Sequence, residues 1–248
     1  MADGTDTWPY GYRARICYTS PPLTTEVFPY EFYQIVPKGV SLSVTSLSIV
    51  VRSKEELDDS YDISLRAARE MRDAGVDIVC LGGLPINIHK GYRNADELIA
   101  GMAAELGVKV TSSANAQTTA AKLLGVKKAV LAHPYAETDT ARISKSYEDL
   151  MQCEVIGRMA WGSPFNRIGG IPQHAAFEMT RKLMKAHPQA DTILFPSPHW
   201  PTCHALDPLE KEFGVNVLGA HQAIVWDSLR RCGIDDKLQG FGRLFRDF

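Results

Sequence analysis

The sequence contains no long hydrophobic run, and no apolar stretch reaches the roughly 18 residues that a membrane-spanning helix needs. Its N-terminus, Met1–Trp8, is polar and acidic, without the basic-then-apolar order of a signal peptide. The 27 basic residues are dispersed and the formal net charge is −2, so the basic patch of nucleic-acid-binding proteins is missing. We therefore expect a cytoplasmic protein that binds neither membranes nor nucleic acid.

Paired cysteines and nucleotide-binding motifs are missing too. The five cysteines include no CxxC pair, and an odd number does not complete a disulfide framework. No GxGxxG or GxxxxGK[ST] run occurs. His199, Cys203 and His204 lie close together, but their spacing matches no closed zinc pattern. The sequence thus predicts reduced thiols, no metal and no cofactor, and an activity that survives chelation.

The chain has 248 residues, 45% of them hydrophobic, which is enough for one large core or two small ones. From Ala14 onward, short apolar runs alternate with amphipathic stretches, a pattern typical of parallel sheets flanked by helices. Helices are predicted before Gly75 and Gly107, and these glycines, Gly125 and Gly214 occupy C-cap positions. The predicted strands are Ala14–Tyr18, Val40–Leu47, Asp77–Leu81, Lys109–Ser112, Lys128–Ala132, Glu154–Met159, Thr192–Phe195 and Asn216–Gly219.

The sequence also repeats itself. The segment Glu105–Val110 is similar in sequence to Glu212–Val217, and each copy is followed by a predicted helix. Ahead of the two copies stand similar strands that run to Gly83 and Ser197, so these two residues fall at matching positions. We expect an α/β protein of two pseudo-two-fold-related lobes, residues 14–115 plus 223–248 and residues 116–222, each a mainly parallel sheet flanked by helices. Ligands of such sheets bind beyond the carboxyl ends of strands, which predicts a cleft between Gly83 and Ser197.

The duplicated halves, the paired strand ends and the closing segment Gly240–Phe245 resemble the aspartate/glutamate racemase superfamily, and within it the arylmalonate decarboxylase and maleate cis-trans isomerase branch. The resemblance runs from Ala14 to Phe245. It implies a cofactor-independent lyase or isomerase that acts on a small carboxylic acid through an enolate-like intermediate. Members of the superfamily typically place one cysteine at each of the two strand ends, and the resemblance puts Gly83 and Ser197 at those positions.

The loop Ser197–His204 concentrates one hydroxyl, two imidazoles and one thiol. A Ser197–His199 pair within hydrogen-bond reach could perform nucleophilic or general-base chemistry, and the Cys203 thiol could be acidified by a helix N-terminus and His204. Ser197, His199 and Cys203 are therefore the predicted catalytic residues. The predicted substrate-binding residues, taken from strand ends and from the resemblance, are Thr19, Gly83, Asn87, Ser113, Tyr135 and His221.

Other functions remain open at this point. Loss of both cysteine positions and the nearby histidines are compatible with a hydrolase of a small amide, imide or lactone that uses Ser197 and His199. A catalytically idle carboxylate-binding protein and a two-base racemase with displaced cysteines are further alternatives. The substrate is left open, as is the choice between a monomer and a homo-oligomer.

Overall fold

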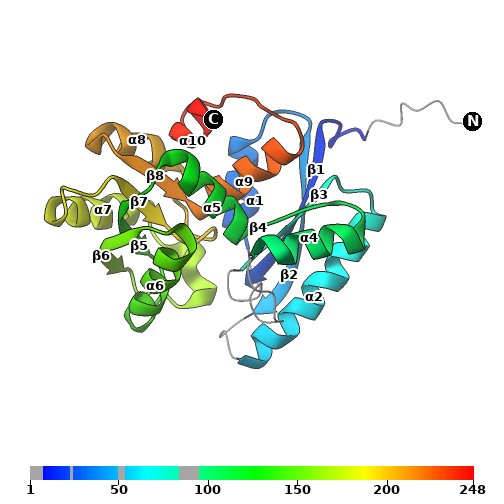
Figure 1. Cartoon of the computed structure of the whole chain (residues 1–248), viewed down its shortest axis with the longest axis horizontal. Coiled ribbons are helices and arrows are strands. Elements are labelled where there is room, and N and C mark those ends of the chain that lie inside the picture. Colours follow the sequence, from blue (N-terminus) through cyan, green and yellow to red (C-terminus); the bar gives the residue numbers. More distant parts are fainter. Residues whose placement is uncertain (1–7, 23–24, 50–53, 84–94) are drawn as a thin grey trace, which may run out of the picture.

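A computed structural model of the chain describes residues 8–22, 25–49, 54–83 and 95–248, which form two α/β halves (Figure 1). The first half contains β1 (Ala14–Pro22), α1 (Val27–Ile35), β2 (Val40–Ile49), α2 (Lys54–Asp73), β3 (Ile78–Leu81), α4 (Ala95–Leu106), β4 (Lys109–Ser112) and α5 (Ser113–Leu124). The second contains β5 (Lys128–His133), η1 (Glu137–Asp139), α6 (Thr140–Met151), β6 (Glu154–Ala160), η2 (Phe165–Gly170), α7 (His174–Ala186), β7 (Thr192–Phe195), α8 (Cys203–Phe213), β8 (Asn216–Gly219), α9 (Ala220–Arg231) and α10 (Arg243–Asp247).

Each half is built on a four-stranded parallel sheet, and the strand orders are β2-β1-β3-β4 and β6-β5-β7-β8. The register repeats as well, because Leu81 pairs with Ser112 in the first sheet as Phe195 pairs with Gly219 in the second. Matching order and register are what a duplicated α/β unit produces. The predicted fold class is therefore confirmed, and all eight predicted strands are present with small shifts at their ends.

Helices α5 and α9 begin directly at the ends of β4 and β8 and pack against each other between the two sheets (Figure 1). The start of α5 is set by Ser112, whose hydroxyl accepts the Asn115 amide as an N-cap, and its end by Gly125, which adopts a left-handed φ of 67°. Helices α2 and α4 contact the first sheet, while α6, α7 and α8 contact the second. The carboxyl ends of β3 and β7 consequently lie beside the central helix pair.

One local prediction is wrong. The first strand was predicted to stop at Tyr18, whereas β1 runs to Pro22 and includes two prolines. Beyond Thr19, which pairs with Leu81, strand β3 has ended, so among the described residues β1 has a neighbouring strand on one side only. A proline is tolerated there because it lacks only the N–H that an edge would leave unpaired, and the register shift between Ser20 and Pro22 absorbs the misfit.

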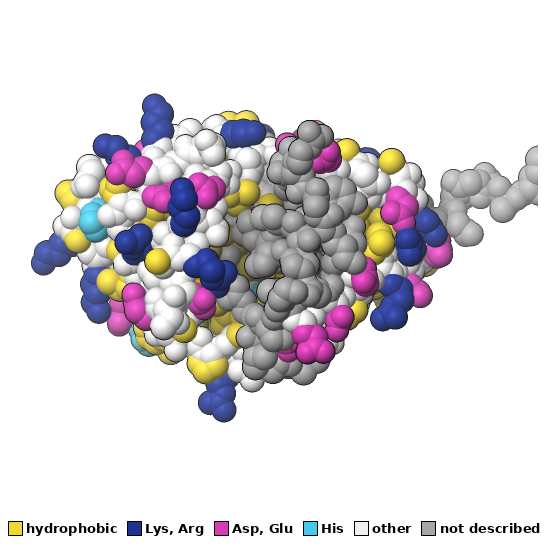
Figure 2. Space-filling model, turned by 60° about the horizontal axis from the view of Figure 1, so that its bottom comes forward, with side chains coloured by type: hydrophobic (Ala, Val, Ile, Leu, Met, Phe, Trp, Pro, Cys, Tyr) yellow, Lys and Arg dark blue, Asp and Glu magenta, His cyan; other side chains and the backbone are white. Residues whose placement is uncertain are grey.

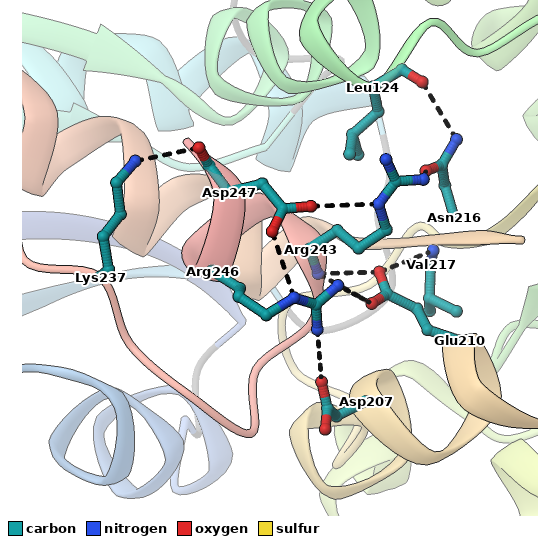
Figure 3. A network of polar contacts seen from close by, with 9 residues as sticks. All are labelled: Leu124, Asp207, Glu210, Asn216, Val217, Lys237, Arg243, Arg246 and Asp247. Carbon is teal, nitrogen blue, oxygen red and sulfur yellow. Dashed lines mark hydrogen bonds and ion pairs between the residues drawn. The ribbon is translucent and has the colours of Figure 1, made fainter. Parts of the chain in front are cut away.

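The closing segment is tied to α8 by a buried carboxylate (Figure 3). Glu210 accepts hydrogen bonds from the backbone amide of Arg243 at 2.8 and 3.0 Å, and from that of Val217 at 3.3 Å. Arg246 reaches both Asp207 at 3.1 Å and Glu210 at 3.6 Å. These contacts fix α10 against β8, and the Gln222 side chain further links the carbonyl oxygen of Phe241 to the amide of Gly219 at the end of β8.

No helix within the described ranges is long and apolar enough to cross a membrane. On the face shown in Figure 2, basic and acidic side chains are interspersed over the described surface, and hydrophobic side chains are visible in the hollow between the two halves.

Candidate active site

The first wall of the site is the junction of β1 and β3. The Gly82 amide donates to the carbonyl oxygen of Thr19 at 3.0 Å and to its hydroxyl at 3.1 Å, and Ser64 donates to the same hydroxyl at 3.2 Å. A Cβ on Gly82 would lie 3.0 Å from Cζ of Tyr18, so the phenol ring presses against this glycine. Gly83 follows with a φ of 83°, a conformation that favours glycine. Thr19 therefore holds the strand ends in place with its hydroxyl.

The second wall is the loop after β7. Ser197 is fully buried, and its hydroxyl oxygen accepts the backbone amide of His199 at 3.4 Å. The imidazole of His199 turns the other way, so that Nδ1 lies 3.3 Å from the Thr25 hydroxyl and Nε2 has no partner among the described residues. The predicted hydrogen bond between the Ser197 hydroxyl and the His199 imidazole is thus not formed. The two side chains stand next to each other but are not coupled as a nucleophile and base.

His199 also lines a small pocket between the two halves. The loop that follows β1 and the turn η2 supply the other walls. Its lining residues are Pro22, Thr25, Glu26, Val27, Phe165, Asn166, Ile168, Gly169 and His199.

The environment of His199 favours the neutral imidazole. Burial, followed by the charge of nearby His221, lowers the pKa of His199 to about 3. Aromatic rings surround it, since Tyr18 and Phe28 lie 6.2 and 6.4 Å away between ring centroids. At pH 7 it can accept or donate a hydrogen bond, but it does not serve as an imidazolium acid.

A pH dependence of stability follows from that shift. An unfolded histidine takes up a proton below about pH 6.5, whereas folded His199 stays neutral down to about pH 3, so its contribution to stability is lost as the pH falls between these values. At pH 5 the expected loss is about 2 kcal/mol. Urea unfolding measures this effect. Between pH 7 and pH 5, the unfolding free energy of the wild type should fall by about 2 kcal/mol more than that of the His199→Gln variant. Equal pH dependence of the two proteins would contradict a buried neutral His199.

Cys203 does not have the environment predicted for it. His204, expected to acidify the thiol, instead places Nε2 2.9 Å from the carbonyl oxygen of Gln173 and packs its ring near Phe177. Burial, with a further contribution from the charge of Glu31, raises the pKa of the Cys203 thiol well above its ordinary value. The surroundings of Cys203 therefore do not favour an acidified thiol at the start of α8, because the cysteine is enclosed rather than exposed at the helix terminus.

The side chains that do meet Cys203 are Glu31 and His221. His221 lies in the first turn of α9, and its Nδ1 is 3.3 Å from Sγ of Cys203 and 3.1 Å from Oε2 of Glu31. Burial opposes ionisation of Glu31, but the hydrogen bond and charge of His221 and the contacts of Cys203 outweigh it, so the pKa of Glu31 lies below its ordinary value. This buried carboxylate–imidazole–thiol cluster joins the α1 segment to α8 and α9.

Two further predicted residues, Ser113 and Tyr135, follow the ends of β4 and β5. Ser113 is buried in the first turn of α5, where its hydroxyl accepts from Gln117 at 3.0 Å. Gln117 in turn accepts the Tyr147 hydroxyl at 2.6 Å, and that hydroxyl also lies 3.2 Å from the carbonyl oxygen of Pro196. Tyr135 packs between the rings of His133 and Phe165. Asn87 lies outside the described residues.

Sequence reasoning overlooked three side chains at this place, namely Tyr18, Thr25 and Glu31. Tyr18 is fully buried, stacks on Phe28 at 3.9 Å, and its hydroxyl has no partner among the described residues. A tyrosine directly before Thr19 and Ser20 at the end of the first predicted strand was an available signal. No comparable signal existed for Glu31, since nothing in its local sequence indicates a partner so distant in the chain.

Comparison with known proteins agrees with this architecture. The sequence profile of the arylmalonate decarboxylase family matches residues 16–245. The arylmalonate decarboxylase of Bordetella bronchiseptica is 24% identical over 192 residues, which cover 75% of this chain and 80% of that protein.

Solved structures give the same result for the fold. A doubly substituted, liganded arylmalonate decarboxylase superposes with a TM-score of 0.83 at 22% identity, covering 95% of this chain and all of the other. The maleate cis-trans isomerase of Nocardia farcinica, solved with a covalently bound succinylcysteine intermediate, gives 0.80 at 21% identity over 95% and 99% of the two chains. The maleate isomerase of Pseudomonas putida S16, solved with maleate, gives 0.80 at 18% identity over 94% and 97%. With a profile that matches nearly its whole length, the chain belongs to the arylmalonate decarboxylase family.

Proposed function

We propose that this protein is a cofactor-independent lyase or isomerase that converts a small carboxylic acid through an enolate-like intermediate, with the reaction at the facing ends of β3 and β7. The observation that carries the proposal is the asymmetry of those ends. Gly83, with its left-handed backbone, offers no side chain, while Ser197 offers a buried hydroxyl. One face of the bound substrate would thus meet a proton-transfer group and the other would not.

That asymmetry suits decarboxylation better than two-base chemistry. When a carboxylate leaves as CO2, the electron pair of the broken C–C bond remains on the α-carbon and spreads onto the neighbouring carbonyl oxygens. One proton must then be added at carbon, and we assign its delivery to the Ser197 hydroxyl, which water reprotonates. The neutral imidazole of His199 would hold that water, because its Nε2 has no partner among the described residues. A positioned general acid or base is typically worth about 10²–10⁴ in rate.

Substrate binding is assigned to the groups that line the two walls. The buried Tyr18 hydroxyl, which has no partner among the described residues, lies beside Gly82 and is suited to donate a hydrogen bond to an enolate oxygen. Burial raises the pKa of Tyr18 well above its ordinary value, which keeps the phenol protonated and able to donate. Tyr135, predicted to hold a carboxylate, remains a candidate for that role. The relatives solved with maleate or a succinyl adduct make a small carboxylate the natural class of ligand.

The hydrolase alternative has less support. It requires the His199 imidazole to reach the Ser197 hydroxyl, whereas that imidazole faces Thr25 and the hydroxyl accepts the backbone amide instead. Cys203 is assigned no proton-transfer role, because its thiol is enclosed by Glu31 and His221.

The experiment is a substrate panel followed by proton NMR in D2O. The purified chain is incubated with aryl- and alkylmalonates, with maleate, and with small amides and lactones. Decarboxylation is expected to release CO2 and leave one deuteron at the α-carbon, while isomerisation would change the vinyl signals of maleate. Turnover of amides or lactones alone would replace this proposal by the hydrolase alternative. Saturable binding of the acids without any turnover would replace it by a carboxylate-binding protein.

A further inference from the structure

Glu31, Cys203 and His221 bring a carboxylate, a thiol and an imidazole together in the interior. Their donor atoms lie within 4.8 Å of one another, and at most 5% of any of the three residues is exposed. They come from three helices, α1, α8 and α9. These are the ligand types that zinc uses in proteins, and none of them takes part in the reaction proposed above.

The spacing of the donors matches a tetrahedral ion. Zinc bonds of about 2.3 Å to sulfur and about 2.0 Å to nitrogen and oxygen place neighbouring ligand atoms about 3.3–3.6 Å apart. Nδ1 of His221 lies 3.1 Å from Oε2 of Glu31 and 3.3 Å from Sγ of Cys203. Movements of a few tenths of an ångström would bring these two pairs to zinc spacing, and the Glu31 oxygen and Cys203 sulfur lie within 4.8 Å of each other.

The surroundings hold the donors in place. The second carboxylate oxygen of Glu31, Oε1, accepts the backbone amide of Cys203 at 3.2 Å, which orients Oε2 toward His221. The ring of Phe28 packs 4.4 Å from that of His221. Nε2 of His221 has no partner among the described residues, so the ring can shift toward an ion without breaking a bond on its far side.

The charges also balance. A divalent cation with a carboxylate and a thiolate forms a neutral group, and a neutral group can be buried without the large cost of an isolated charge. Three protein donors leave one tetrahedral position for a water molecule. From these observations we infer that Glu31, Cys203 and His221 form a zinc-binding site that links the segment after β1 to the helices on either side of β8. The inference is independent of the proposed reaction.

Cobalt(II) titration tests the site, because a thiolate ligand gives cobalt a charge-transfer band in the near ultraviolet and a four-coordinate site gives strong visible bands. The full chain is purified with a chelator, which is then removed, and is titrated both folded and during refolding. We expect one cobalt ion per chain, both sets of bands, and their loss on addition of zinc. Since the donors are buried, loading should be slow in the folded chain and complete after refolding.

Variants identify the ligands. Cys203→Ser should abolish the charge-transfer band, and Glu31→Gln should weaken zinc binding by about 100-fold or more, because losing a ligand costs more than the 10–100-fold typical of residues that orient one. Cys80→Ser is the matched control for a buried thiol, and His174→Ala controls for loose binding at the exposed His174–Glu178 pair, whose atoms are 3.9 Å apart. Both controls should bind like the wild type.

Absence of the charge-transfer band from the refolded wild type would overturn the inference, as would an unchanged band in Cys203→Ser. Should Cys203→Ser fail to fold, Glu31→Gln decides the matter, since unchanged zinc affinity in that variant would refute the site. The readouts do not depend on turnover. A negative result here therefore leaves the proposed reaction untouched.

Discussion

Replacing Ser197 or His199 by alanine is expected to lower kcat by about two orders of magnitude or more on the substrate that the NMR panel identifies, with the fold intact. Ser197→Ala removes the hydroxyl that we assign to proton delivery. His199→Ala removes the neutral imidazole that would hold the water behind it. Both act on proton transfer in the transition state, so KM should change less than kcat. Steady-state kinetics measure kcat and KM, and circular dichroism at the same pH checks that the fold is intact.

His204→Ala is the matched control, because it removes a nearby imidazole, in the first turn of α8, whose Nε2 contacts the Gln173 carbonyl oxygen. Its kcat should stay within a few-fold of the wild type. Cys80→Ala tests the other wall of the site. Because Cys80 is fully buried in β3, this substitution should mainly lower the stability of the protein, by leaving a small cavity. If Ser197→Ala and His199→Ala retain full kcat while Cys80→Ala abolishes it, the chemistry belongs to the opposite side of the cleft.

Gly82→Ala is expected to destabilise the protein by about 3 kcal/mol or more. The added Cβ would overlap the carbonyl oxygen of Thr19 and lie 2.8 Å from Cδ of Pro21, and both belong to a paired strand that cannot move aside cheaply. Relief of the overlap would separate the Gly82 amide from both oxygens of Thr19 that it bonds. Urea unfolding monitored by circular dichroism measures the loss.

Gly170→Ala provides the comparison. A Cβ there would meet nothing within 4 Å, and the backbone of Gly170 is not left-handed. Its unfolding free energy should fall between no change and a gain of about 1 kcal/mol, since alanine restricts the unfolded chain. Similar effects of the two substitutions would mean that the β1–β3 junction is loose, and the assignment of Tyr18 and Gly83 to one wall of the site would lose its basis.

Local sequence patterns were sufficient for the fold. Strands such as Thr192–Phe195 and Asn216–Gly219 match their predicted bounds because each is a short apolar run, bounded by polar residues or a turn, whose signal lies within the run itself. The duplication was readable for the same reason, since both copies keep the glycine that ends a helix and the strand that follows it. Gly83 and Ser197 could be matched from the sequence because each is the seventh residue of a similar segment, Asp77–Gly83 and Asp191–Ser197.

The relations among the site side chains were decided by the tertiary structure. His221 and Glu31 are 190 residues apart in the chain, and Cys203 and Glu31 are 172 apart, so their contact depends on how α1 packs against the second half. The sequence paired Cys203 with its neighbour His204, but successive residues of a helix point in different directions and the two side chains diverge. The protonation of His199 likewise depends on burial, which is a property of the whole fold. The sequence alone therefore determined the strands and the places of Gly83 and Ser197 after two of them, whereas packing decided which side chains face one another and in what charge state.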